Sequence, residues 1–229
     1  MAQKLNLAKP HRQIHVGVIL MNSETELQDV APVDLLHGLS SHWLNSLPDD
    51  LGPPGFKAGA LDMAFHWVTE GGPGAPGALT SGLGIVVTDS FESCPPLDIV
   101  LIGAAQFGYQ ANEAELAFVR KCYEECTAFL TVCGGVEIPR AAGILDGKSA
   151  TGPRAMIPFY QSTGTTTWLE KRWVHDGKVW TSGALFNGCD MVHAFIKHTW
   201  AGTPTAVAAG FLATMGSWPD RDVDYKDGP

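Results

Sequence analysis

The chain has 229 residues, of which 45% are hydrophobic and 17% are charged, and its formal net charge is −9 at pH 7. These values describe a globular protein with a sizeable core, and the negative charge argues against nucleic acid or an anionic membrane as a partner. Five cysteines without regular spacing fit a reducing compartment better than a disulfide framework. Because the first twelve residues are polar and no run is long enough to span a membrane, we predict a cytoplasmic protein.

Short apolar runs alternate with amphipathic segments along the chain, which predicts an α/β fold with a mostly parallel sheet and helices on both faces. The predicted strands are 14–21, 63–68, 83–87, 97–102 and 129–132, and 173–180 has the Asp-Gly signal of a hairpin. The predicted helices are 30–44, 113–126, 136–142, 189–199 and 205–215, with loops at 48–60 and 71–77. We predict one domain over 13–218, between a polar N-terminal tail, 1–12, and a polar C-terminal tail, 219–229.

The strand ending at Val132 leads directly into Cys133, Gly134 and Gly135. This strand–Cys–helix pattern resembles the elbow that exposes a nucleophilic serine in hydrolases. A helix N-terminus above the thiol would lower its pKa, so we expect Cys133 to be a reactive thiolate. The alternative is a buried structural cysteine, which is common among free cysteines.

Several further segments match in order and spacing the ThiJ/PfpI family, within the class I glutamine-amidotransferase-like superfamily. They are residues 29–34, 93–104, 132–135, 142–151, 181–183 and 188–190. The chain most resembles the isonitrile hydratase branch and its fungal relatives. The resemblance implies a flavodoxin-like fold, a nucleophilic cysteine and a homodimer, to which we expect Trp43, Trp168 and Trp200 to contribute.

The family places a carboxylic acid beside its cysteine, four residues before the proline of the first helix. Here that position holds Gln28, and Asp29 is next to it. Either Asp29 takes the role of the acid through a one-residue shift, or Gln28 faces the cysteine and the site has lost its proton-transferring group. A third interpretation makes Asp29 a helix cap.

The resemblance also implies that backbone N–H groups of Gly103, Ala104 and Gly134 stabilise an oxyanion. Many members carry a histidine where this chain has Gly152, so we predict no Cys–His dyad. No two histidines have the spacing of metal ligands on one helix face, and we predict neither a metal nor another cofactor.

Aromatic residues follow several of the motifs, and Phe107, Tyr109 and Phe186 are predicted, with Gly152, to line an apolar substrate pocket. The sequence thus favours a cofactor-independent, cysteine-dependent enzyme acting on a small apolar molecule, with isonitrile hydration to an N-formamide as the nearest activity by resemblance. One alternative is a lyase, cyclase or isomerase of specialised metabolism at the same site. Another is a non-enzymatic redox-sensing or chaperone-like dimer with an oxidisable Cys133.

Overall fold

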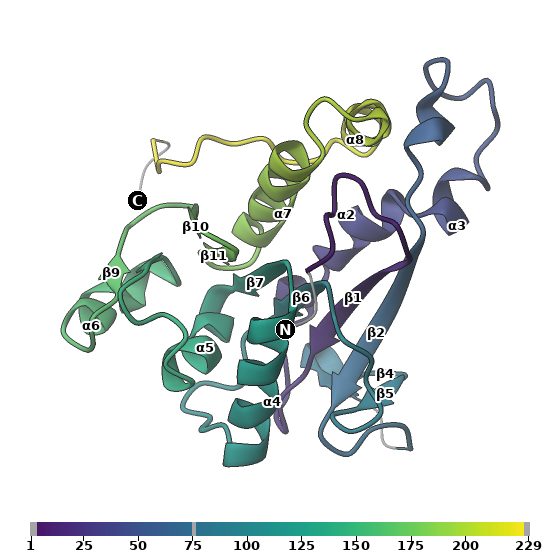
Figure 1. Ribbon diagram of the computed structural model, residues 1–229. Coiled ribbons are helices and arrows are strands. Elements are labelled where there is room, and N and C mark those ends of the chain that lie inside the picture. Colours follow the sequence, from purple (N-terminus) through teal and green to yellow (C-terminus); the bar gives the residue numbers. More distant parts are fainter. Residues whose placement is uncertain (1–3, 75–76, 227–229) are drawn as a thin grey trace.

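The computed structural model describes residues 4–74 and 77–226 (Figure 1). Residues 75 and 76 of the predicted loop 71–77, and residues 1–3 and 227–229 of the two predicted tails, lie outside the described residues. No helix in the described part of the chain is long and apolar enough to cross a membrane.

The described strands form one large sheet with the order β10-β11-β7-β6-β1-β2-β5, and its strands are parallel except for β10, which runs antiparallel to β11. The bounds are β1 (Ile14–Ile19), β2 (Met63–Thr69), β5 (Asp89–Ser90), β6 (Ile99–Ile102), β7 (Ala128–Val132), β10 (Trp173–Asp176) and β11 (Val179–Ser182). Two small pairs stand apart, β3 (Gly77–Leu79) with β4 (Leu83–Ile85) and β8 (Ser149–Ala150) with β9 (Thr167–Trp168). The buried parallel strands are near-continuous apolar runs because both of their faces are covered.

Helices cover both faces of the sheet, as Figure 1 shows, and each face has its own hydrophobic core. One core includes side chains of α2 (Val33–Gly38), α7 (Asn187–Thr199) and α8 (Pro204–Met215). The other includes side chains of α4 (Glu113–Glu125), α5 (Glu137–Ala141) and α6 (Ile157–Gln161). Shorter elements are α1 (Leu27–Val30), α3 (Ser41–Leu44) and the 3-10 turns η1 (Phe56–Gly59), η2 (Thr80–Gly82), η3 (Cys133–Val136) and η4 (Arg154–Met156). The α/β prediction is confirmed.

The predicted helix 30–44 is instead divided into short helices. Pro32 separates α1 from α2, where its ring removes a backbone donor. Ser40 then starts α3 by accepting a hydrogen bond from the Trp43 N–H at 3.2 Å. The chain therefore changes direction between α1, which contacts β6, and the helices that follow it.

Both predicted tails pack against the domain within their described parts. Leu5 and Leu7 are buried, and the Leu7 carbonyl accepts a hydrogen bond from the Trp200 indole at 2.8 Å. At the other end, Arg221 binds the buried Asp190 carboxylate at 2.5 Å. The expectation that Trp168 and Trp200 contribute to a dimer face is wrong, because both are buried in the chain's own core.

Candidate active site

Cys133 is the first residue of η3, at the sharp turn that follows β7 at the carboxyl end of the sheet. Its φ is +57°, a left-handed conformation that costs energy for a residue other than glycine. The turn depends on Gly135, since a Cβ there would lie 2.4 Å from the Ile102 carbonyl oxygen, a backbone atom fixed in the neighbouring strand. Tight packing of η3 against the end of β6 thus places the thiol at the carboxyl ends of the central strands.

Asp29 reaches the same place from α1, and its side chain is fully buried. Its Oδ2 accepts a hydrogen bond from the Ala104 N–H at 3.0 Å. Gly103 makes this approach possible, because a Cβ at that position would lie 2.9 Å from the Asp29 Cβ. The end of β6 therefore holds the acid against the elbow.

The other Asp29 oxygen, Oδ1, makes no hydrogen bond of ordinary geometry with the described residues. The Leu185 N–H and the Cys133 thiol face the carboxyl group and favour its charged form. One ligand-type atom from each of Glu26, Asp29 and Cys133 lies within 4.8 Å of the other two. A buried acid with one poorly satisfied oxygen next to a thiol is an arrangement suited to proton transfer.

Burial, together with the neighbouring Asp29, raises the pKa of Cys133 to about 12. The expectation of a lowered pKa is wrong for this geometry. The helix α5, which follows the cysteine, has only five residues, and the carboxyl groups beside the sulfur oppose a second negative charge. At neutral pH the structure therefore holds Cys133 as a thiol.

Burial also raises the pKa of Asp29, to about 7, and the charge of Glu26 acts in the same direction. The N–H of Ala104 opposes this shift by stabilising the carboxylate. An acid with a pKa near neutrality can both accept and return a proton under physiological conditions.

The expected oxyanion donors are arranged differently from one another. The Ala104 N–H is already used by Asp29, so the geometry does not leave it free for substrate. The Gly134 N–H faces the sulfur of Cys133, as does the N–H of Leu185. Leu185 was missed in the sequence, because a leucine does not signal the left-handed conformation, with φ of +52°, that it adopts in the loop after β11. Glu26 was missed as well, because nothing local distinguishes it from the neighbouring Glu24.

Gln28 is exposed, whereas the adjacent Asp29 is buried. Of the two neighbours that the sequence left as alternatives, the structure brings Asp29 to Cys133. Asp29 does not cap the helix that opens near Pro32, because it lies inside α1 and Pro32 itself is the N-cap of α2.

The predicted pocket residues are only partly brought together. Gly152 is buried, and a Cβ there would lie 3.8 Å from the Cys133 carbonyl oxygen and 3.1 Å from Tyr160. Phe107 and Phe186 are 93% and 60% exposed and come from the loops after β6 and before α7. Tyr109 instead donates its hydroxyl hydrogen to Glu115 at the start of α4, at 2.8 Å. Its hydroxyl group is therefore used in the fold.

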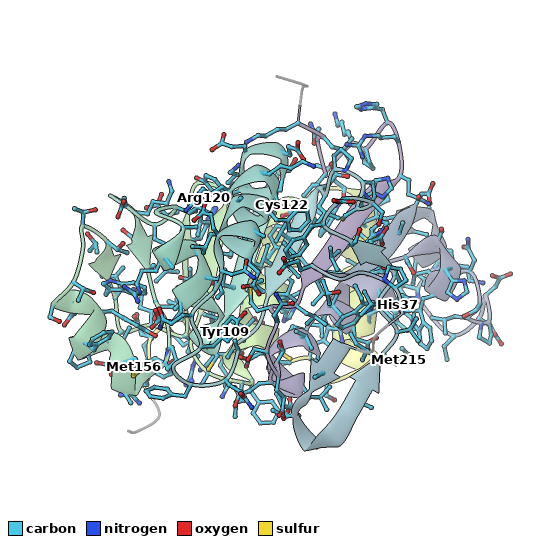
Figure 2. The ribbon with its side chains drawn as sticks, turned by 90° about the horizontal axis from the view of Figure 1, so that it is seen from below. His37, Tyr109, Arg120, Cys122, Met156 and Met215 are labelled. Carbon is cyan, nitrogen blue, oxygen red and sulfur yellow. The ribbon has the colours of Figure 1, made fainter. Side chains whose placement is uncertain are left out.

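Two cavities lie away from Cys133. A cavity of about 370 Å³ is lined by residues that include His175, Lys178 and His198. A smaller one, about 150 Å³, includes His37 and Met215, which lie close together in Figure 2. Neither contains the acid–thiol group, and we place the candidate site at Cys133 because the chemically competent groups converge there.

Glu26, Asp29 and Cys133 are also the set of described residues whose composition could hold a metal ion. The set has two carboxylates and one thiol, whereas zinc sites with three protein ligands usually include at least one histidine. We therefore interpret it as an acid–thiol site.

A parallel sheet between helical layers, with a cysteine at a strand–helix turn, defines a flavodoxin-like α/β protein with a nucleophile elbow. The chain belongs to the DJ-1/PfpI family, which matches residues 62–198. This confirms the resemblance that the sequence motifs indicate.

Individual relatives differ in kind. The chain is 31% identical over 144 residues to an isonitrile hydratase from Pseudomonas putida, a match that covers 62% of each protein and so less than two thirds of the relative. A ThiJ/PfpI family protein from Pseudomonas syringae has a TM-score of 0.69 at 18% identity, covering 95% of this chain and 80% of that one. An AraC family transcriptional regulator from Pseudomonas putida has a TM-score of 0.65 at 14% identity, covering 88% of this chain and 99% of that one. The structural matches establish the fold alone.

Proposed function

We propose that the protein is a cofactor-independent enzyme that hydrates an isonitrile to an N-formamide, with Cys133 as nucleophile and Asp29 as the proton-transferring group. The observation that carries the proposal is the buried Asp29 carboxyl group within 4.8 Å of the Cys133 thiol at a strained elbow. The similarity to an isonitrile hydratase supports the reaction class.

In the first step the sulfur of Cys133 bonds to the terminal carbon of the isonitrile. The ionised form of Asp29 accepts the thiol proton as that bond forms, because a thiol with a raised pKa needs a base. One π pair of the carbon–nitrogen triple bond moves to nitrogen, and the isonitrile carbon keeps its own lone pair, so the negative charge lies on carbon. Asp29 returns the proton to this carbon, which gives a thioimidate bound to Cys133.

In the second step water adds to the thioimidate carbon. Asp29 accepts a proton from the water and gives it to the nitrogen, so that a tetrahedral adduct forms. The adduct's hydroxyl proton then leaves through Asp29 to the sulfur while the carbon–sulfur bond breaks. The products are the N-formamide and the Cys133 thiol, so the sum is isonitrile plus water and needs no oxidant or cofactor.

The side chains near the site favour an apolar substrate. Leu185 is 37% exposed and belongs to the loop whose backbone faces Cys133, and the adjacent Phe186 is more exposed still. Exposed apolar residues next to a reactive group are typical of a surface that binds apolar ligands. An isonitrile carries an uncharged reactive carbon on an apolar substituent and fits these surroundings.

A redox-sensing role agrees less well with the electrostatics. Oxidation by peroxide follows thiolate character, and the raised pKa of Cys133 disfavours the thiolate at neutral pH. A lyase, cyclase or isomerase that uses Asp29 without covalent attack remains the alternative. It would form no covalent intermediate on Cys133, which distinguishes it from the proposed mechanism.

The test is to incubate the purified protein with a panel of alkyl and aryl isonitriles and to measure formamide by mass spectrometry. We expect turnover, and after rapid acid quenching we expect a covalent adduct on the peptide that contains Cys133. Replacing Cys133 by Ala should abolish both, whereas Cys189→Ala, a matched change at another partly buried cysteine, should retain them.

Turnover by Cys133→Ala at the wild-type rate would refute the covalent mechanism. Absence of formamide across the whole panel, with a folded protein, would refute the proposed reaction.

A further inference from the structure

Glu26 lies next to the acid–thiol pair and has no role in the mechanism described so far. Its carboxyl oxygen is within 4.8 Å of both an Asp29 oxygen and the Cys133 sulfur, and its side chain is half-buried. Within the described part of the chain, this carboxyl group makes no hydrogen bond or ion pair. Two carboxyl groups at this distance, without a cation between them, interact unfavourably when both are ionised.

The backbone fixes this pair. The Glu26 N–H donates to the Ala104 carbonyl oxygen at 3.0 Å, and the Ala104 N–H donates to Asp29 Oδ2 at 3.0 Å. The Asp29 N–H in turn donates to the Glu26 carbonyl oxygen at 3.1 Å. Ala104, in the loop after β6, therefore binds the backbone of Glu26 and the side chain of Asp29, so the two residues stay neighbours as long as these hydrogen bonds are kept.

Three other groups that face Asp29 favour its charged form. They are the Cys133 thiol at the elbow, the Ala104 N–H in the loop after β6 and the Leu185 N–H in the loop after β11. Among these neighbours Glu26 is the group whose charge favours the protonated acid.

We propose that Glu26 is the second acid of the site and acts through Asp29, because its negative charge adds to the effect of burial and makes Asp29 a stronger base towards the thiol proton. A carboxylate with an ordinary pKa would be a much weaker base than the thiolate that it must generate. This inference rests on the proposed function for its catalytic meaning, but the effect of Glu26 on Asp29 is independent of any substrate.

The experiment is a pH titration of the Asp29 carboxyl group by infrared difference spectroscopy, with the band assigned by its loss in Asp29→Asn. We expect the midpoint to fall by roughly one pH unit or more in Glu26→Gln, because a like charge is removed. Glu26→Asp keeps the charge and should leave the midpoint near that of the wild type. Glu24→Gln is the matched control in the same loop, where the carboxyl group faces Gln106 instead, and should not change it.

With isonitrile as substrate, the acid limb of kcat/KM should move in the same direction in Glu26→Gln, since the reactive form has Asp29 ionised. An Asp29 midpoint that is the same in Glu26→Gln and the wild type would overturn the inference. A shifted midpoint in a protein that turns over no isonitrile would leave the inference standing and refute the proposed function, so the two failures are distinguishable.

Discussion

Replacing Asp29 by Asn should make the protein more resistant to alkaline pH while it removes activity. Asp29 has an ordinary pKa of 3.8 in the unfolded chain and about 7 in the folded protein. Because the folded state binds this proton more tightly, the group's favourable contribution is fully present below pH 3.8 and is lost as the pH rises towards 7. At 1.36 kcal/mol for each pKa unit, the loss is about 1.6 kcal/mol at pH 5 and about 4 kcal/mol at pH 8.

The relevant quantity is the difference between the two proteins. Other groups titrate alike in both, so the stability of the wild type relative to Asp29→Asn should fall by roughly 2–3 kcal/mol between pH 5 and pH 8. In thermal unfolding this corresponds to a relative change in Tm of about 5–10 °C for a chain of this size. Isonitrile turnover by the variant should be severely reduced, because an amide cannot transfer the proton.

Urea unfolding, followed by circular dichroism at several pH values, measures this difference directly. Parallel stability curves for the two proteins from pH 5 to pH 8 would refute the reasoning, since they would mean that Asp29 ionises in the folded state as easily as in the unfolded chain. Full activity in Asp29→Asn would show that the carboxyl group is not the proton-transferring group.

Three further expectations concern other parts of the structure. Gly135→Ala should cost about 1–3 kcal/mol in urea unfolding, because the new methyl group would meet the fixed carbonyl of Ile102, and an unchanged midpoint would contradict the packing at the elbow. His15 is hydrogen-bonded to His66 at 2.9 Å, and its pKa is lowered by burial and by the charge of His66. Its favourable contribution to stability should therefore be present above about pH 6.5 and be lost as the pH falls. The free energy of unfolding should accordingly fall less between pH 7 and pH 5 in His15→Gln than in the wild type. Light scattering should give a homodimer, to which α8, a helix without a charged residue, offers an apolar face, and a monomer at micromolar concentration would contradict this expectation.

Local sequence predicted most of the large elements. The apolar runs of β1, β6 and β7 and the periodicity of α4 and α7 were sufficient, since a strand buried on both faces and an amphipathic helix each leave a pattern within a few residues. The hairpin of β10 and β11 followed from its Asp-Gly turn. The segment 30–44 was harder, because its helical spacing continues across Pro32 whereas the backbone bends there to reach the end of the sheet.

Cys133 could be recognised from its own surroundings, since a strand followed by Cys-Gly-Gly indicates a tight turn without reference to the rest of the fold. The ionisation state of Cys133 could not be predicted from these surroundings. The local pattern suggested a helix that favours a thiolate, whereas burial and the carboxyl group of Asp29, more than one hundred positions away in the chain, favour the thiol.

The sequence by itself determined the α/β architecture, the family and the cysteine at the elbow, because periodicity and turn chemistry are local properties of the chain. Only the tertiary structure decided between Gln28 and Asp29 as the partner of the cysteine. It also directed the Ala104 N–H to the Asp29 carboxyl group and brought Glu26 and Leu185 close to the thiol. These outcomes depend on which loops meet at the carboxyl ends of β1, β6, β7 and β11, and on how completely their packing excludes water. Acidity and hydrogen bonding at the site are set by that shared burial, which no single segment of the sequence encodes.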